Sequence, residues 1–253
     1  MIMSMLIQFQ IILLSFQSVW LHQLTGESDV VFMSAHLTYC AAHQNCFNWG
    51  RSKGRIGYMI GENYKNIFQY CNCSQHLWVN INSLLHPRNY SRVRRWSYGE
   101  KVPKLDGFEI DNFRANYTTM SYSTLIYTPK ETFVHVNTLN STYAHVCQIG
   151  RLIGRKSGIR RELFRTELLS HGKLVAHSDQ TVGCLTKTTE PTTAGCALRC
   201  HQNLICRSFY YNKKLETCII TEYVDSLLSP ASWNLAPFTW SRFSRLEWSF
   251  VEV

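Results

Sequence analysis

Long apolar runs are scarce in this chain of 253 residues, and the one that stands out lies at its start. Between Met1 and Trp20, short apolar groups alternate with glutamine and serine, and no acidic residue occurs before Glu27. A stretch interrupted in this way makes a poor membrane span and is typical of the hydrophobic region of a secretory signal peptide. We therefore predict a signal peptide over residues 1–26 and no integral membrane span in the mature chain. The alternative is an uncleaved signal anchor.

Catalytic signatures are also missing. The sequence contains no G-x-S-x-G nucleophile elbow, no H-E-x-x-H zinc motif and no glycine-rich phosphate loop. Histidine and cysteine are plentiful, but pairs such as His145 and Cys147 lack the spacing of zinc sites. We therefore predict that the protein is not an enzyme and that it holds no metal ion or other cofactor.

Acidic residues are few, since 17 aspartates and glutamates stand against 26 lysines and arginines, a net charge of +9. The stretch from Arg151 to Lys173 holds seven basic and two acidic residues, so +5 of that excess lies there. Outside the cell, such clusters meet sulfated or sialylated glycans and membrane surfaces rather than nucleic acid. The alternative is an ordinary solvated surface. The candidate ligand-binding residues, taken from this stretch and from a second basic cluster, are Arg92, Arg94, Arg95, Arg160 and Arg161.

Cysteine is abundant and even in number, with ten residues in two groups. Closely spaced cysteines in an even number indicate disulfides and an oxidising compartment. Asparagine sequons point the same way, because N-x-S/T tripeptides after a signal peptide are glycosylation sites on surface loops. We predict a secreted, extracellular glycoprotein with acceptor sites at Asn72, Asn89, Asn116 and Asn140.

Apolar spacing in the first half changes from a helical period to a strand period. Tyr39, Ala42 and Cys46 share one face of a helix that Ser34 or Thr38 could cap. A second amphipathic segment covers residues 64–71, and short aromatic and β-branched runs follow at 77–81, 124–127 and 143–147. Two helices followed by strands predict an α+β domain.

These segments resemble the C-type-lectin-like domain, a fold of two helices with antiparallel strands. The resemblance covers about residues 28–149 and depends on motif order, so we place this domain at 27–150. It implies that the helix cysteine is bridged to the closing-strand cysteine, Cys46 to Cys147. The segments that carry it are Tyr39 to Cys46, Gly54 to Ile60, Leu77 to Ile81, Trp96 to Gly99 and Tyr143 to Cys147.

The residues that bind calcium in sugar-binding members of that family have no counterpart here. Pro103 lies between Val102 and Lys104 instead of between carboxylate or amide residues, and Phe133-Val134-His135 stands where the second triplet is expected. None of these side chains is a good calcium ligand. The resemblance therefore implies protein or sugar ligands bound without calcium, although acidic residues at 106–112 leave an irregular calcium site as an alternative.

The second half carries the spacing Cys-x3-Cys-x5-Cys-x11-Cys, in which Cys196 and Cys200 lie one helical turn apart. Together with the strand that begins at Cys206, this pattern resembles the PAN/apple module, a small disulfide-stapled α+β unit. The resemblance implies the bridges Cys200–Cys206 and Cys196–Cys218. We place this domain at 163–253 after a basic linker at 151–162, and we expect it to fold alone because both bridges are internal.

Cys40, Cys71, Cys73 and Cys184 are left without a partner, and three intramolecular pairings are open to them. Our main hypothesis is a secreted or surface-associated binding and adhesion protein whose partners are extracellular glycans or glycoproteins, without calcium. The alternative is a structural coat or matrix component, a disulfide-linked oligomer in which the unassigned cysteines crosslink subunits.

Overall fold

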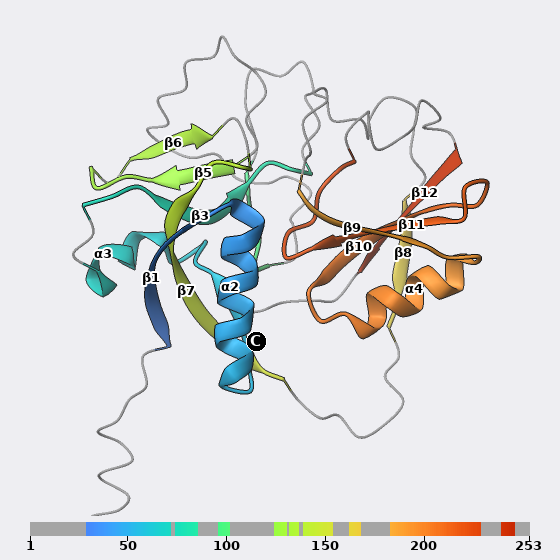
Figure 1. Ribbon diagram of the computed structural model, residues 1–253, viewed down its shortest axis with the longest axis horizontal. Coiled ribbons are helices and arrows are strands. Elements are labelled where there is room, and N and C mark those ends of the chain that lie inside the picture. Colours follow the sequence, from blue (N-terminus) through green and yellow to red (C-terminus); the bar gives the residue numbers. More distant parts are fainter. Residues whose placement is uncertain are drawn as a thin grey trace, which may run out of the picture.

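The computed structural model describes residues 29–71, 74–85, 96–101, 124–130, 132–136, 139–153, 162–167, 183–228 and 239–245. These residues form an α+β structure with two sheets, each packed against a helix, that lie side by side along the long axis (Figure 1). No helix in these ranges is long and apolar enough to cross a membrane. The predicted signal peptide, residues 1–26, lies outside them.

The first helix, α2 (Tyr39–Ser52), begins where the sequence predicts. Thr38 has an extended backbone, and its hydroxyl accepts a hydrogen bond from the amide of Ala41 at 3.4 Å, which caps the first turn. The face defined by Tyr39, Ala42 and Cys46 is fully buried. The helix ends before Gly54, whose φ of +69° is a left-handed conformation that favours glycine.

The first sheet is built around one long strand, β7 (Tyr143–Leu152). It pairs with β1 (Val30–Leu37) and with β2 (Arg55–Met59) in antiparallel fashion, and with β3 (Leu77–Asn82) in parallel. Beyond β3 the sheet continues through the remaining strands of this half, β4 (Ser97–Tyr98), β5 (Thr124–Tyr127) and β6 (Phe133–Val136). Strand β1 did not figure among the predicted strands, and it places the start of the described chain beside β7.

Two glycines let α2 approach the sheet closely. A Cβ on Gly57 would lie 1.9 Å from the carbonyl oxygen of Cys46, and one on Gly50 would lie 2.1 Å from the amide nitrogen of Gly57. Backbone therefore packs directly on backbone at this point, which also brings the Cys46 turn of the helix close to β7.

The second predicted helix lies where its apolar spacing places it, over residues 64–70, but only its second turn is α-helical. A single 3₁₀ turn (η1, Tyr64–Asn66) is followed by one α-helical turn, α3 (Ile67–Tyr70). Neither turn has a side-chain cap at its start, and so short a helix depends on tertiary packing. Ile67 provides that packing, because its side chain is fully buried in the first sheet's core.

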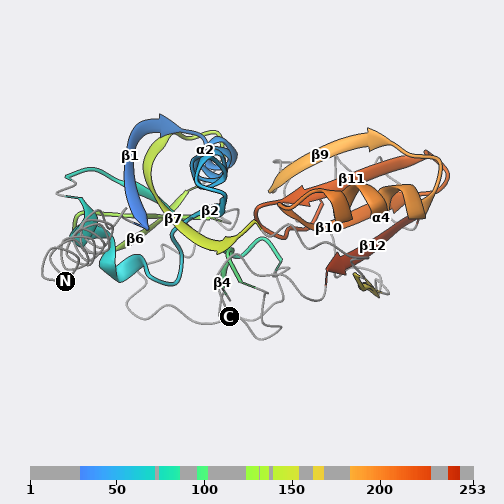
Figure 2. The same ribbon diagram turned by 90° about the horizontal axis from the view of Figure 1, so that it is seen from below.

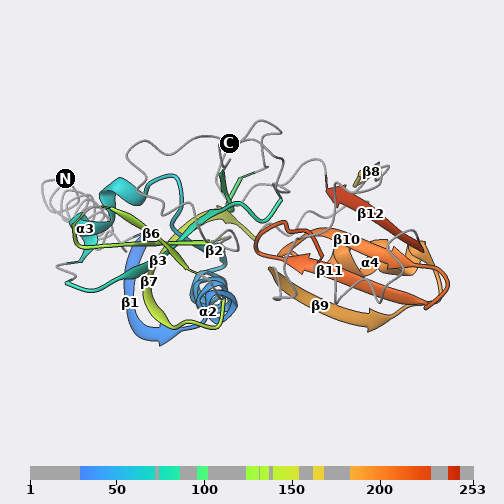
Figure 3. The same cartoon turned by 90° about the horizontal axis from the view of Figure 1, so that it is seen from above.

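The second sheet has five strands, in the order β8 (Phe164–Glu167), β12 (Trp240–Arg245), β10 (Cys206–Asn212), β11 (Thr217–Glu222) and β9 (Cys184–Thr189). Its helix, α4 (Thr193–Gln202), is capped by Thr192, whose hydroxyl accepts from the amide of Gly195 at 3.0 Å. Seen from below and from above, α4 runs along one face of the sheet and β9 forms its free edge (Figures 2 and 3). The sequence predicted α4 and the hairpin of β10 and β11, but not β8 or β9.

Disulfides join helix to sheet in both halves. The structure forms Cys46–Cys147, Cys196–Cys218 and Cys200–Cys206, the three pairs that the two resemblances imply. A fourth bridge, Cys40–Cys184, was left open by the sequence, and it joins α2 to the edge strand β9 across the two halves. Cys71 is also disulfide-bonded, and Cys73 lies outside the described residues.

The two halves also share a hydrophobic core. One cluster of buried side chains contains Tyr39, Phe47 and Trp78 from the first half together with Ile205, Tyr223 and Val224 from the second. The expectation of an independent second domain was based on its two internal bridges alone. The bridge to Cys40 and this shared core change that expectation, because separation would expose apolar surface and leave Cys184 without its partner.

We expect a fragment of residues 163–253 to be less stable than the same region in the whole chain, and to form disulfide-linked dimers through Cys184. Thermal unfolding and non-reducing gels would test this, with the Cys184→Ser fragment as the control that lacks dimers but keeps the loss of stability. A monomeric fragment as stable as the intact protein would contradict the shared core.

Candidate functional site

Two features of the described residues have the form of a site, the seam between the halves and a groove on the second sheet. The seam is organised by Tyr223, which follows β11 and has a φ of 64°. A bulky residue in this left-handed region costs on the order of 1–3 kcal/mol. The ring lies stacked on His43 at a centroid distance of 5.4 Å, and its hydroxyl donates to Gln44 Oε1 at 2.5 Å. Packing against α2 therefore holds the strained residue in place.

Arg207 ties the backbones of the two halves together. The register of β10 against β11 shifts between Cys206 and Ser208, so Arg207 occupies a β-bulge, and bulges redirect side chains. Its Nε donates to the carbonyl of Tyr223 at 2.8 Å and its Nη2 to the carbonyl of Gly99 at 3.2 Å. The guanidinium is buried, so these bonds form in a medium of low dielectric.

Three ionisable groups of the first half are buried at or beneath this seam. Burial, with Arg207 and His145 nearby, lowers the pKa of His43 to about 3. Burial also lowers the pKa of His145 to about 4. Glu100 accepts a hydrogen bond from the amide of Glu62, but its burial outweighs this and raises its pKa to about 7. Both histidines are therefore neutral at physiological pH.

The groove lies between α4 and the strands β9 and β11 and has a volume of about 320 Å³. This is near the lower limit for small-molecule sites. Ile220, a buried residue of β11, is its one apolar lining side chain. The polar lining residues come from β9, α4 and the end of β11, and they are Thr186, Thr188, Arg199, Gln202, Asn203 and Glu222.

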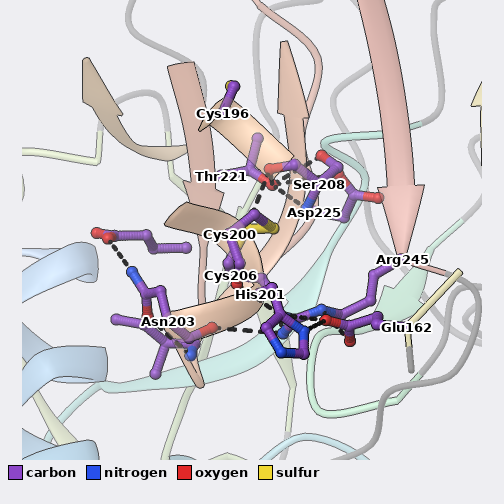
Figure 4. Close-up of a disulfide and its surroundings, with 12 residues drawn as sticks. Glu162, Cys196, Cys200, His201, Asn203, Cys206, Ser208, Thr221, Asp225 and Arg245 are labelled. Atoms are coloured by element: carbon purple, nitrogen blue, oxygen red, sulfur yellow. Dashed lines mark hydrogen bonds and ion pairs between the residues drawn. A yellow bond between two sulfur atoms is a disulfide. The ribbon is translucent and has the colours of Figure 1, made fainter. Parts of the chain in front are cut away.

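Disulfides and polar side-chain contacts hold the walls of this groove in place (Figure 4). Asn203 donates to Glu222 Oε1 at 2.9 Å, which joins the end of α4 to β11. Glu162 contacts both His201 at 2.7 Å and Arg245 at 2.6 Å beside the Cys200–Cys206 bridge. These contacts position the C-terminal end of α4 relative to the sheet.

A second network of polar contacts joins β10 and β12 of the second sheet to the segment that follows β11. The carboxylate of Asp225 accepts from the hydroxyl of Ser208 and from Arg242, each at 2.5 Å, and all three residues are buried. A buried charge pair is weak evidence for stability, but removal of one partner is strongly destabilising because it leaves an uncompensated buried charge. The sequence offered no signal for it, because the three residues come from three separate segments.

Most of the predicted ligand and glycan residues lie outside the described residues. This applies to Arg92, Arg94, Arg95, Arg160 and Arg161 and to the sequons at Asn72, Asn89 and Asn116. Asn140 is described, and it lies exposed in the turn before β7, where a glycan would be accessible. The acidic residues at 106–112, the alternative calcium site, also lie outside.

One cluster has the composition of a metal site. The ligand atoms of Cys46, His145 and Cys147 lie within 4.8 Å of one another and are buried. The two sulfur atoms are bonded to each other, so neither is a thiolate that could ligate an ion. His145 Nε2 contacts the amide of Asn45 at 3.1 Å instead.

Comparison with known proteins gives few matches. No family model and no curated protein matches the chain. Among solved structures, a Ca²⁺-dependent type II antifreeze protein in its Ca²⁺-free form is 12% identical and covers 47% of this chain and 88% of its own, with a TM-score of 0.31. A type II antifreeze protein from herring is 10% identical and covers 47% and 87%, with a TM-score of 0.32. Similarity at this level carries no conclusion about fold or ligand.

We expect Tyr223→Ala to destabilise the protein by about 3–5 kcal/mol, the usual cost of removing a buried aromatic side chain. Tyr223→Phe keeps the ring and loses only the bond to Gln44, so about 1 kcal/mol should be lost. Denaturant unfolding of the secreted protein measures both. Equal, small losses in the two variants would show that the ring does not hold the seam.

Stability should fall as the pH drops below 6.5. The unfolded chain then protonates both histidines, whereas the folded chain does so only near pH 4 and pH 3. Glu100 acts in the opposite direction between pH 7 and its ordinary value of 4.5. Two histidines act against one carboxyl group, so stability should show a net loss on the order of 1 kcal/mol per pH unit between pH 6.5 and pH 4.5.

Melting temperatures measured from pH 8 to pH 4.5 test this balance. His43→Phe keeps a ring against Tyr223 and should flatten the acid limb, whereas Glu100→Gln should raise stability at pH 8 and steepen the loss below it. An unchanged slope in His43→Phe would exclude His43 as its source.

Proposed function

We propose that this chain is a secreted or surface-associated binding and adhesion protein that recognises carbohydrate or protein ligands without calcium, and that it is not an enzyme. In this proposal a lectin-like first half and a PAN-like second half form one rigid unit. The observation that carries it is the set of disulfides, which join α2 to β7, α4 to the β10–β11 hairpin, and one half to the other.

The arrangement of the first half supports its lectin-like part. Strands β1 and β7, from the two ends of this half, pair side by side, and β7 is bridged to α2 through Cys147. In the second half, α4 packs on a five-stranded antiparallel sheet and is bridged at both Cys196 and Cys200. This is the helix-on-sheet staple that the PAN/apple resemblance implies.

Binding without calcium is supported by strand β6. Phe133 packs into the core of the first sheet and Val134 is 44% exposed, so the outward side chain at this position is an alkyl group. Calcium requires oxygen ligands, and Val134 supplies none. The side chain of His135 lies outside the described part of this strand.

An extracellular location is consistent with the four described bridges, because such disulfides persist in oxidising compartments. The alternative of a crosslinked coat or matrix component loses its main support. It depended on Cys40, Cys71, Cys73 and Cys184, but Cys40 and Cys184 pair within the chain and Cys71 is bonded. The described cysteines leave no free thiol for a bond between subunits.

We expect the secreted protein to bind a subset of glycans on an array equally well with and without a calcium chelator. Binding to sulfated or sialylated members should weaken with salt, since exposed charges about 10 Å apart are largely screened at 0.1 M. Arg160→Ser combined with Arg161→Ser should weaken those members only. Loss of all binding on chelation would contradict the calcium-free proposal, and the absence of glycan binding would leave a protein ligand.

A further inference from the structure

The groove on the second sheet has walls that are fixed before any ligand arrives. Its helix is bridged to β11 by Cys196–Cys218 and to β10 by Cys200–Cys206, and β9 is bridged to α2 by Cys40–Cys184. All three elements that line the groove therefore carry a disulfide. A site built in this way loses little conformational entropy on binding.

Its lining presents neutral hydrogen-bonding groups. Thr186, Thr188 and Gln202 each offer both a donor and an acceptor. Within the described chain, none of these three side chains makes a hydrogen bond, and Thr186 and Gln202 are exposed. Thr186 lies directly opposite Ile220 in the sheet register, so its hydroxyl stands beside the apolar floor. Free donors and acceptors around a small apolar surface suit a ligand that carries several hydroxyl groups on a carbon ring.

The charges at the groove are already paired or bonded. Arg199 forms an ion pair with Glu190, and Glu222 accepts from Asn203. The Asn203 side chain is fixed in turn, because its Oδ1 accepts from the amide of Ile205 at 3.0 Å. The one arginine and the one glutamate of the lining balance each other, so the groove carries no net charge that would attract an anionic ligand.

We propose that this groove binds an uncharged saccharide unit, held by the side chains of Thr186, Thr188 and Gln202 over Ile220. The inference rests on the proposed binding function and names the ligand class of this surface. It separates the groove from the basic residues predicted to bind anionic glycans. The complex should therefore be insensitive to salt as well as to chelators.

The test uses the full-length secreted protein and the variant Thr186→Val combined with Gln202→Ala. Valine keeps the shape of threonine and removes its hydroxyl, and alanine removes the amide. The loss of the hydrogen bonds that these two side chains make to the sugar should lower affinity about tenfold or more. The probes are immobilised neutral sugars, namely glucose, galactose, mannose and their N-acetylated amines, followed by saturation-transfer NMR with the sugar that binds.

Two matched controls keep the groove intact. Leu198 is 54% exposed on α4 and does not line the groove, and Lys187 is exposed on β9 beside Thr186 but alternates to the other face. Leu198→Ala and Lys187→Ala should bind the neutral sugar as the parent protein does. All variants should unfold at the parent temperature, because they replace side chains at the surface.

The outcomes are separable. A tenfold loss in the double variant with unchanged controls and no salt dependence supports the groove. Neutral-sugar binding that survives the double variant overturns the groove and leaves the proposed function standing. Binding confined to anionic glycans, to cationic ligands or to proteins also overturns it. If no glycan binds at all, carbohydrate recognition fails for the whole protein and the groove inference fails with it.

Discussion

The relative position of the two halves depends on the insertion of Tyr223 against α2. The ring stacks on His43 and meets Phe47 at an edge, so an aromatic group from the second half completes the helix packing of the first. Its left-handed backbone is unfavourable by itself. Packing on α2, the bulge at Arg207 and the Cys40–Cys184 bridge hold the surrounding segments together and offset this cost.

Sequence reasoning succeeded where the determining interactions are local. Thr38 caps α2 and the buried face follows helical spacing, and the cysteine spacing around 196–218 locates a helix and a hairpin. It also located the helical segment at 64–71, but apolar spacing does not distinguish a 3₁₀ turn from an α-helical one, and residues 64–66 form a 3₁₀ turn. The Cys40–Cys184 pair, the Arg207 bulge and strand β9 depend on contacts between distant segments, which no local pattern reports.

The groove on the second sheet could be predicted from the sequence even less well than the fold. Thr186, Gln202 and Glu222 are ordinary surface residues in the sequence, and only the packing of α4 beside β9 brings them to one groove. The basic clusters had a strong compositional signal, yet charge alone does not define a concave surface. Reasoning from composition therefore favoured anionic ligands, whereas the described geometry favours a neutral one at this groove.

A rigid seam has a consequence for recognition. When two binding surfaces are joined by a flexible linker, part of the binding free energy is lost in ordering that linker, and the effective concentration of the second site depends on linker length. Here a disulfide and a buried aromatic contact replace that freedom. Under the proposed binding function, surfaces on the two halves would be held at one spacing, so a branched or repeated ligand with matching spacing would gain avidity without an ordering cost. Ligands of other spacing are excluded by geometry rather than by contact chemistry.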